Sequence, residues 1–99
     1  MADFYTYILT NPDRITLYAG MTNDLRKRLI HHYQEHGNPK TFAGRYYCHR
    51  LVYYEIHETA YEAIQREKTI KKWRRAKKEA LIASLNPQWR FLNDYFWKA

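Results

Sequence analysis

Cysteine, glycine and proline are scarce in this chain, and their scarcity excludes several classes of protein. Cys48 is the single cysteine among 99 residues, so no internal disulfide can form, which agrees with a reducing compartment. The chain has only three glycines and three prolines, and its residues are 45% hydrophobic and 17% aromatic. This composition argues against disorder. A chain of this length can bury one core, so we expect a single domain over residues 1–99.

Long apolar runs are also missing. No segment approaches the roughly 20 apolar residues that a membrane-spanning helix needs, and the start "MADFYTYILTNP" lacks the positively charged opening of a secretory signal. We therefore expect no membrane association and a cytoplasmic location.

Positive charge, in contrast, is abundant. The sequence has 17 Lys and Arg residues and 10 Asp and Glu residues, which gives a net charge of +7. This balance indicates a polyanionic partner, with nucleic acid ahead of an anionic membrane surface.

The first third of the chain has the pattern of a β-hairpin followed by a helix. "DFYTYIL" over residues 3–9 and "ITLYAG" over residues 15–20 are rich in aromatic and β-branched residues and flank an Asn-Pro-Asp turn. Gly20 is expected to close the second strand. Thr22 or Asn23 can cap the helix, with Asp24 in its first turn, and the helical spacing of apolar residues extends to about His36.

The rest of the chain predicts one more strand and further helices. "RLVYYEI" over residues 50–56 has the composition of a strand, and Thr59 begins a helix that should reach Lys72 or beyond. The following basic segment is expected to stay helical to Leu85, where Pro87 stops it. The aromatic tail should fold back on the core. The predicted order is ββ-α-β-α with a further C-terminal helix.

One carboxylate interrupts the apolar face of the helix that begins at Thr59. The apolar positions recur three or four residues apart and are Ala60, Ile64, Ile70 and Trp73. Glu67 lies in the middle of this stripe. Because burying a carboxylate is costly unless a cation neutralises it, Glu67 should meet a positive charge.

Basic side chains interrupt the apolar face of the first helix in the same way. Arg28 and His32 are neighbours at positions i and i+4 on the face formed by Leu25, Leu29 and Tyr33. One interpretation is a buried structural ion pair between Arg28 and Glu67. The other is a polar cleft for an anionic ligand where the two helices meet the hairpin.

Two tyrosines of the hairpin bear on this choice. Tyr7 and Tyr18 are expected to lie opposite each other on the two strands and could line the cleft. Tyrosines in strands more often pack in the core, and that alternative remains open at this point.

Two stretches of the sequence resemble a known family. "YTYILTNPDRITLYAGMTNDLRKRLIHH" is similar to the opening of the GIY-YIG nuclease domain, which occurs in intron homing endonucleases and in the bacterial excinuclease subunit that cuts 3′ of a lesion. The "REKTIKKWRRAKK" helix and the "NPQW" segment resemble the small stand-alone members. The resemblance covers residues 4 to about 92 and implies an α/β fold, with a small three-stranded antiparallel or mixed sheet flanked by helices.

The resemblance also implies a catalytic set. By position the family's functional residues correspond to Tyr7, Tyr18, Arg28, His32 and Glu67. The sequence departs from the family pattern in two places. Gly and Ile of the first motif are replaced, which the stand-alone branch tolerates, and Met21 stands where the excinuclease has a lysine that contacts the substrate phosphate.

In the family's chemistry these residues have distinct roles. Glu67 would hold Mg²⁺, with Mn²⁺ as a substitute, and Arg28 would offset the charge that develops on the phosphorane. Tyr18, or His32 acting through it, would take the proton from the attacking water, and Tyr7 would orient the water or the phosphate. The implied function is a DNA endonuclease or nickase, of the kind used in DNA repair or recombination.

Two other functions stay open at the level of the sequence. One is a nucleic-acid-binding module whose catalysis has decayed, and the other is an adaptor that recruits a larger machine. The presence of all five catalytic residues argues against decay.

A basic segment directly follows Glu67. Seven of the eleven residues from 68 to 78 are basic, namely Lys68, Lys71, Lys72, Arg74, Arg75, Lys77 and Lys78. Taken alone, this run could be a solvated helix face. Next to a site for phosphodiesters, it is predicted to bind the phosphates of nucleic acid, most plausibly DNA, without reading sequence.

Histidines are numerous, but the sequence lacks a Cys-x-x-Cys pair or a full set of zinc ligands. This argues against structural zinc. A catalytic Cys-His pair at Cys48 is equally disfavoured, because its surroundings contain no sign of an activated nucleophile.

Overall fold

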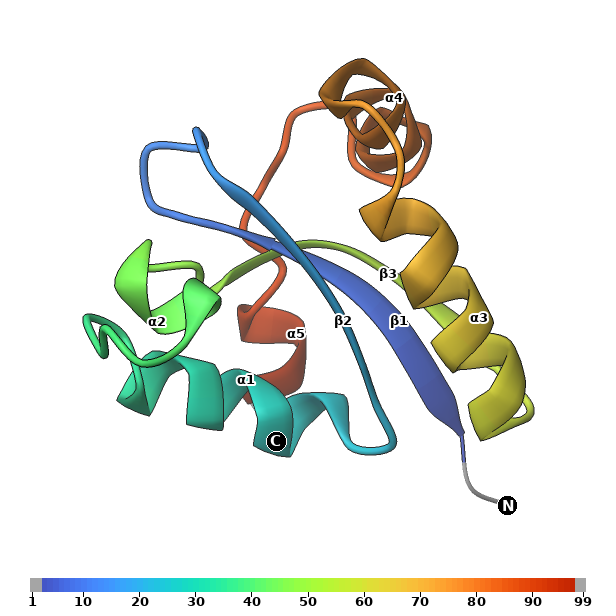
Figure 1. Ribbon diagram of the computed structural model, residues 1–99, viewed down its shortest axis with the longest axis horizontal. Helices are drawn as coiled ribbons and strands as arrows, with labels where there is room; N and C mark the ends of the chain where they lie inside the picture. The colour runs from blue at the N-terminus through green and yellow to red at the C-terminus, as the bar shows by residue number, and fades with distance from the viewer. Residues whose placement is uncertain (1–2, 98–99) are drawn as a thin grey trace.

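Three antiparallel strands form the centre of the fold (Figure 1). In the computed structural model, which describes residues 3–97, β1 (Phe4–Thr10) is the middle strand. It pairs with β2 (Leu17–Thr22) on one side and β3 (Arg50–His57) on the other, giving the order β2-β1-β3. The antiparallel three-stranded sheet with flanking helices confirms the predicted fold class.

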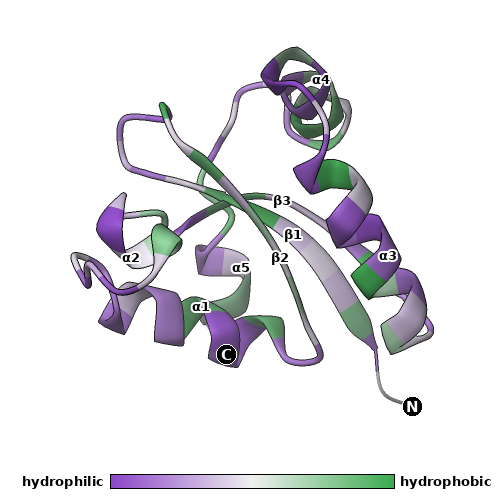
Figure 2. Ribbon diagram, viewed as in Figure 1, coloured by the Kyte–Doolittle hydropathy of each residue, from purple (hydrophilic) through white to green (hydrophobic). Residues whose placement is uncertain are grey.

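Helices cover both faces of this sheet (Figure 1). α1 (Leu25–Gln34), α2 (Phe42–Arg45) and α5 (Asp94–Trp97) lie on one face, and α3 (Ala60–Lys71) and α4 (Arg75–Leu85) lie on the other. Figure 2 shows hydrophilic and hydrophobic residues alternating along α3 and α4, as expected for amphipathic helices that pack one side on a sheet.

Two hydrophobic clusters follow from the alternation of side chains along β1. Tyr7 and Leu9 point to the face that α1 covers, and they are 1% and 0% exposed. Ile8, between them in sequence, points to the opposite face and packs with Ile70 of α3 and Ile82 of α4. Each face of the sheet therefore has its own core.

α1 is shorter than the sequence pattern predicted. Its N-cap is Asp24, whose carboxylate accepts a hydrogen bond from the amide of Lys27 at 3.0 Å, so Asp24 precedes the first turn. Of the residues expected on its inner face, His32 is buried, but Arg28 is exposed and Tyr33 is 47% exposed. The inner face of α1 is narrower than expected because the helix contacts the sheet mainly through its leucines.

The helical segment after β3 is interrupted, and the expectation of continuous helix to Leu85 is wrong at residues 72–74. A continuous helix over residues 60–85 would be about 39 Å long, which exceeds the 33 Å length of the molecule. The chain bends at Trp73, which is half-buried against the second cluster. The bend allows both α3 and α4 to pack on the same face of the sheet.

The aromatic tail folds back on the core, as predicted. Asn93 is 2% exposed, and its side chain accepts from the amide of Leu51 at 2.8 Å and donates to the carbonyl of His49 at 2.9 Å. These bonds fix the tail along β3, and Leu92 and Phe96 then pack against the first cluster.

The register of the hairpin differs from the expected one. Tyr7 is paired with Gly20 and Tyr18 with Leu9, so the two tyrosines are not directly opposite. Gly20 also does not close the strand, which continues to Thr22. A Cβ at position 20 would lie 2.6 Å from Cζ and Oη of Tyr7 and 3.1 Å from Cε2 of Tyr18. Glycine is required here because both tyrosine rings lie against its Cα.

We expect Gly20→Ala to destabilise the protein by about 1–3 kcal/mol, the usual cost of forcing an extra carbon into a packed core. Urea unfolding measures this change. The exposed substitution Ala83→Gly serves as a comparison for the cost of an alanine–glycine exchange without a clash. Gly20→Ala with unchanged stability would show that the ring of Tyr7 moves aside at no cost.

Candidate active site

At the centre of the candidate site, a buried hydrogen bond joins one residue of the central strand to one residue of α1. The hydroxyl of Tyr7 on β1 lies 2.8 Å from Nε2 of His32 on α1. Burial raises the pKa of Tyr7 and lowers that of His32 to about 4, so both are neutral at pH 7. The hydrogen bond thus joins two neutral groups, and the tautomer of the imidazole sets whether the phenol or Nε2–H is the donor.

Tyr18 lies beside this pair without hydrogen-bonding to His32. Its ring centroid is 5.5 Å from that of His32 and 6.5 Å from that of Tyr7. The hydrogen bond of His32 thus goes to Tyr7, whereas the sequence had suggested that His32 acts through Tyr18. Tyr18 is half-buried and forms part of a cavity wall.

This cavity has a volume of about 180 Å³ and brings three of the predicted catalytic residues together. Its lining consists of Tyr18, Arg28, His31, His32, Glu35, Thr41, Phe42 and Ala43. Arg28 also lines a neighbouring groove with Lys27 and Asn23. Within residues 3–97 the guanidinium of Arg28 makes no ion pair, so it is available to an anionic ligand in either hollow.

Glu67 meets a lysine of its own helix. Its side chain is 19% exposed, and one carboxylate oxygen lies 3.4 Å from Nζ of Lys71, one turn further along α3. The ion pair with Arg28 that the sequence allowed is absent from the described part of the chain. Burial is the main cause of the raised pKa of Tyr7, and the negative charge of Glu67 adds to it.

Two hydrogen bonds fix α3, and with it Glu67, relative to the sheet. The hydroxyl of Thr6 donates to the carbonyl of Ala63 at 2.9 Å in the buried interior. Nε of Arg66 donates to Oε1 of Glu55 on β3 at 2.7 Å. Because Arg66 directly precedes Glu67, this anchor limits rotation of the helix at the position of the carboxylate.

Glu67 is the carboxylate of the candidate site that could bind a divalent metal. Nowhere in residues 3–97 do three or more His, Cys, Asp or Glu side chains gather as a metal cluster. Glu67 fits Mg²⁺ bound by one carboxylate with waters and a substrate phosphate, which is a common arrangement for this ion. It does not fit a metal held entirely by protein ligands.

Neither Cys48 nor His49 lines the cavity beside Tyr18. Burial raises the pKa of the Cys48 thiol to about 11, so the thiol is protonated at neutral pH and is not an activated nucleophile. His49 is 5% exposed, and burial lowers the pKa of its imidazole, as it does for His32.

The predicted nucleic-acid-binding residues do not share one helix face. Lys68 and Lys71 are in α3, Lys72 and Arg74 are in the bend, and the rest are in the first turn of α4. Six of the seven are exposed, and Lys78 is half-buried.

Two of these basic residues have structural contacts. The guanidinium of Arg75 donates to the carbonyls of Ile15 and Arg14 in the hairpin turn and pairs with Glu79 at 2.9 Å. Nζ of Lys77 lies 4.4 Å from the ring centroid of Trp73. These contacts hold α4 against the hairpin and the bend, so they compete with binding of a ligand.

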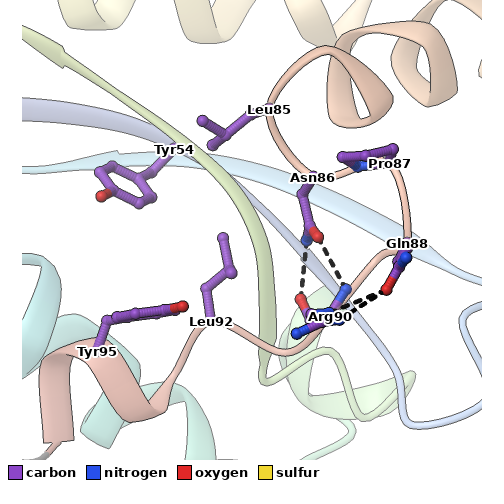
Figure 3. Close-up of a pocket in the computed structure, with 8 residues that line it drawn as sticks. All are labelled: Tyr54, Leu85, Asn86, Pro87, Gln88, Arg90, Leu92 and Tyr95. Atoms are coloured by element: carbon purple, nitrogen blue, oxygen red, sulfur yellow. Dashed lines mark hydrogen bonds between the residues drawn. The ribbon is translucent and has the colours of Figure 1, made fainter.

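A larger cavity, about 440 Å³, lies elsewhere, along β3 and the C-terminal segment (Figure 3). None of the five predicted catalytic residues lines it. The amide of Asn86 donates to the carbonyls of Val52 and Arg90 and accepts from the amide of Arg90. Asn86 therefore shapes a loop in this structure and does not line the cavity beside Tyr18.

A protein-family model matches most of this chain. This model, described as "GIY-YIG catalytic domain", matches residues 3–80. The chain belongs to the GIY-YIG family. Membership implies a nuclease-type function on nucleic acid, and GIY-YIG nucleases generally use a divalent metal.

Relatives within the family have similar length. The UPF0213 protein of Bacillus pumilus is 42% identical over 81 residues, which is 82% of this chain and 80% of the relative. That of Natronomonas pharaonis is 40% identical over 82 residues, covering 83% and 93%. The solution NMR structure of a UPF0213 protein from Bacillus halodurans is 29% identical, with a TM-score of 0.56 and coverage of 93% and 95%.

Five residues that line the cavity beside Tyr18 were not predicted as site residues from the sequence. They are His31, Glu35, Thr41, Phe42 and Ala43. The segment around Thr41 reads as a break after α1, yet Thr41 caps the short helix α2 by accepting from the amide of Gly44 at 3.0 Å. A Thr cap followed by an aromatic residue was the only available signal.

No helix within residues 3–97 is both long enough and apolar enough to cross a bilayer.

The lowered pKa of His32 predicts a loss of stability in acid. Above about pH 6.5 the imidazole is neutral in both folded and unfolded chains, and between that pH and about 4 only the unfolded chain binds the proton. The free energy of unfolding should therefore fall by up to about 3 kcal/mol across this window because of His32. His32→Gln keeps an acceptor for Tyr7 and cannot titrate, so its urea-unfolding free energy should fall less between pH 7 and 4.

His31→Gln is the matched control, because it removes an exposed histidine next in sequence. Its pH dependence should follow that of the parent. His49 is present in all three proteins, so its contribution to the pH dependence of the unfolding free energy cancels in the comparison. Equal slopes for His32→Gln and the parent would contradict a buried neutral His32.

Proposed function

We propose that this chain is a metal-dependent phosphodiesterase that hydrolyses DNA as an endonuclease or nickase. The proposal rests on one observation above the others: Tyr18, Arg28 and His32 surround one cavity. The pair formed by Glu67 and Lys71 adjoins it, because Nζ of Lys71 is 5.7 Å from the ring centroid of Tyr18. Tyr18 and Arg28 therefore line a space that a phosphate could enter, and the carboxylate of Glu67 is linked to it through Lys71 beside Tyr18.

Arg28 supplies the positive charge for the reacting phosphate. Its exposed guanidinium lies at the junction of the cavity and the neighbouring groove. A phosphodiester that is attacked by water gains negative charge on its equatorial oxygens. Two parallel N–H donors of a guanidinium match this geometry and stabilise the transition state more than the ground state.

Tyr18 is the proposed general base. Unlike the hydroxyl of Tyr7, which is 1% exposed and occupied by His32, Tyr18 faces the cavity. As a phenolate it accepts the proton of the attacking water. The neutral Tyr7–His32 pair supports the wall behind it and fixes the position of the ring, with contact across Gly20.

Glu67 would hold Mg²⁺ or Mn²⁺, which polarises the scissile phosphate and stabilises the leaving 3′ oxygen. The exposed lysines of α3 and the bend, Lys68 and Lys72, bind flanking phosphates through charge alone. One such site per chain cuts one strand at a time. A place in DNA repair or recombination agrees with a nicking activity.

The first test is cleavage of labelled duplex, branched and single-stranded DNA and of RNA, with and without Mg²⁺ or Mn²⁺. The parent should cleave a DNA substrate only with metal, and Glu67→Gln should abolish cleavage. Because Glu67 has only a partly exposed ion pair to lose, the metal-free variant should lose no more than about 1 kcal/mol of stability. A thermal melt and urea unfolding without metal check this point.

Three outcomes of this test separate the rival functions. Binding of DNA without cleavage by the parent favours the inactive binding module, and binding of neither nucleic acid favours the adaptor. A metal-free Glu67→Gln variant that loses about 3–5 kcal/mol would contradict the metal role, since that cost is typical of a broken buried ion pair.

The role of Tyr18 predicts a loss of rate without a loss of binding. Tyr18→Phe keeps the ring that packs beside His32 but removes the hydroxyl, so single-turnover cleavage should slow by about 10²–10⁴ while DNA affinity persists. The rate is measured at saturating protein and metal from pH 6 to 10. Arg28→Lys and Arg28→Ala are the companion variants. Arg28→Lys should recover little of the cleavage rate that Arg28→Ala loses, because lysine lacks the planar guanidinium with its paired donors.

The same experiment can reject this assignment. Tyr18→Phe with the parental rate and pH profile would show that another group takes the proton, and His32 would then be the first candidate.

A further inference from the structure

Lys71 differs from the other basic residues near the end of α3 because it lies between two residues of the candidate site. Its ammonium is 3.4 Å from a carboxylate oxygen of Glu67 and 5.7 Å from the ring centroid of Tyr18. Lys77 is placed over Trp73, and Arg75 is bound to the hairpin turn. Lys71 is therefore the basic residue of this segment whose contacts, within residues 3–97, lead into the site.

The local geometry suits a cation that can change partners. The side chain of Lys71 is 49% exposed, so its pair with Glu67 is weak and easily displaced. The ammonium has three donors on a flexible stem and can turn from a carboxylate to a phosphate without a change in the backbone. Lys68, one residue from Glu67 on the same helix, is exposed but has no ion pair in the described chain.

We propose that Lys71 is a member of the active centre with two successive partners. In the free protein it neutralises Glu67. When a divalent metal binds Glu67, the released ammonium moves toward Tyr18 and donates to an oxygen of the substrate phosphate. This inference rests on the proposed phosphodiesterase function and assigns Lys71 a role at the reacting phosphate, beyond general attraction for the DNA backbone.

The proposal predicts two opposite effects of Lys71→Gln. The metal no longer displaces an ion pair, so Mn²⁺ should bind about 2- to 5-fold more tightly. The reacting phosphate loses a donor, so single-turnover cleavage at saturating metal, protein and DNA should slow by roughly 10- to 100-fold. A lysine that merely attracts DNA would weaken DNA binding and change neither quantity.

Metal binding is measured without substrate, by titrating Mn²⁺ and following the broadening of the backbone amide signals of α3 in NMR spectra. Glu67→Gln should abolish the local broadening, which assigns it to this carboxylate. Lys68→Gln removes the same charge one residue away from Glu67, and its Mn²⁺ affinity should change less than that of Lys71→Gln. The amide spectrum of each variant also reports whether it is folded.

The outcomes separate the two proposals. Tighter Mn²⁺ binding together with slower cleavage supports the role of Lys71. Unchanged Mn²⁺ affinity, or an unchanged rate at saturation, overturns it while leaving the proposed function intact. Absence of Mn²⁺ broadening near Glu67 in the parent protein overturns the metal-dependent function and the role of Lys71 together.

Discussion

The hydrogen bond between the Tyr7 hydroxyl and Nε2 of His32 is the interaction on which the candidate site depends. It joins the central strand to α1 at the base of the cavity, and it can form only because Gly20 leaves room for the tyrosine ring. Burial keeps both partners neutral at pH 7. A neutral pair in the interior avoids the desolvation cost that a buried ion pair would have, so the site is held rigidly with little loss of stability.

Charge is distributed around this neutral centre in a way that suits an anionic substrate. Arg28 is exposed and Lys71 is half exposed, so each keeps its hydration until a phosphate arrives. Glu67 is the less exposed partner of its pair and is held by the anchor of α3 to β3. The fixed carboxylate and the mobile cations together give a site in which ligand binding, more than folding, brings charges together.

Local structure was largely predictable from the sequence. The hairpin, the strand of residues 50–57 and the helix after Thr59 follow from alternation, helical spacing and a cap, all of which act over a few residues. Tyr18, Arg28 and His32 line one cavity, and their catalytic role stays a prediction that rests on their order and spacing, which resemble those of the GIY-YIG family. Glu67 was recognised as an unusual carboxylate on an apolar face, although the sequence left its partner open.

The choice of partners was decided only by the tertiary structure. Sheet register pairs Tyr7 with Gly20, and packing of α1 gives His32 to Tyr7 instead of Tyr18. The bend at Trp73 lets α3 and α4 pack on the same face of the sheet, and the helical pattern could not reveal it. Periodicity and caps determine which segments become strands and helices, because they depend on neighbouring residues. Distances between segments far apart in the chain depend on register, bends and packing, and these distances determine which polar groups meet.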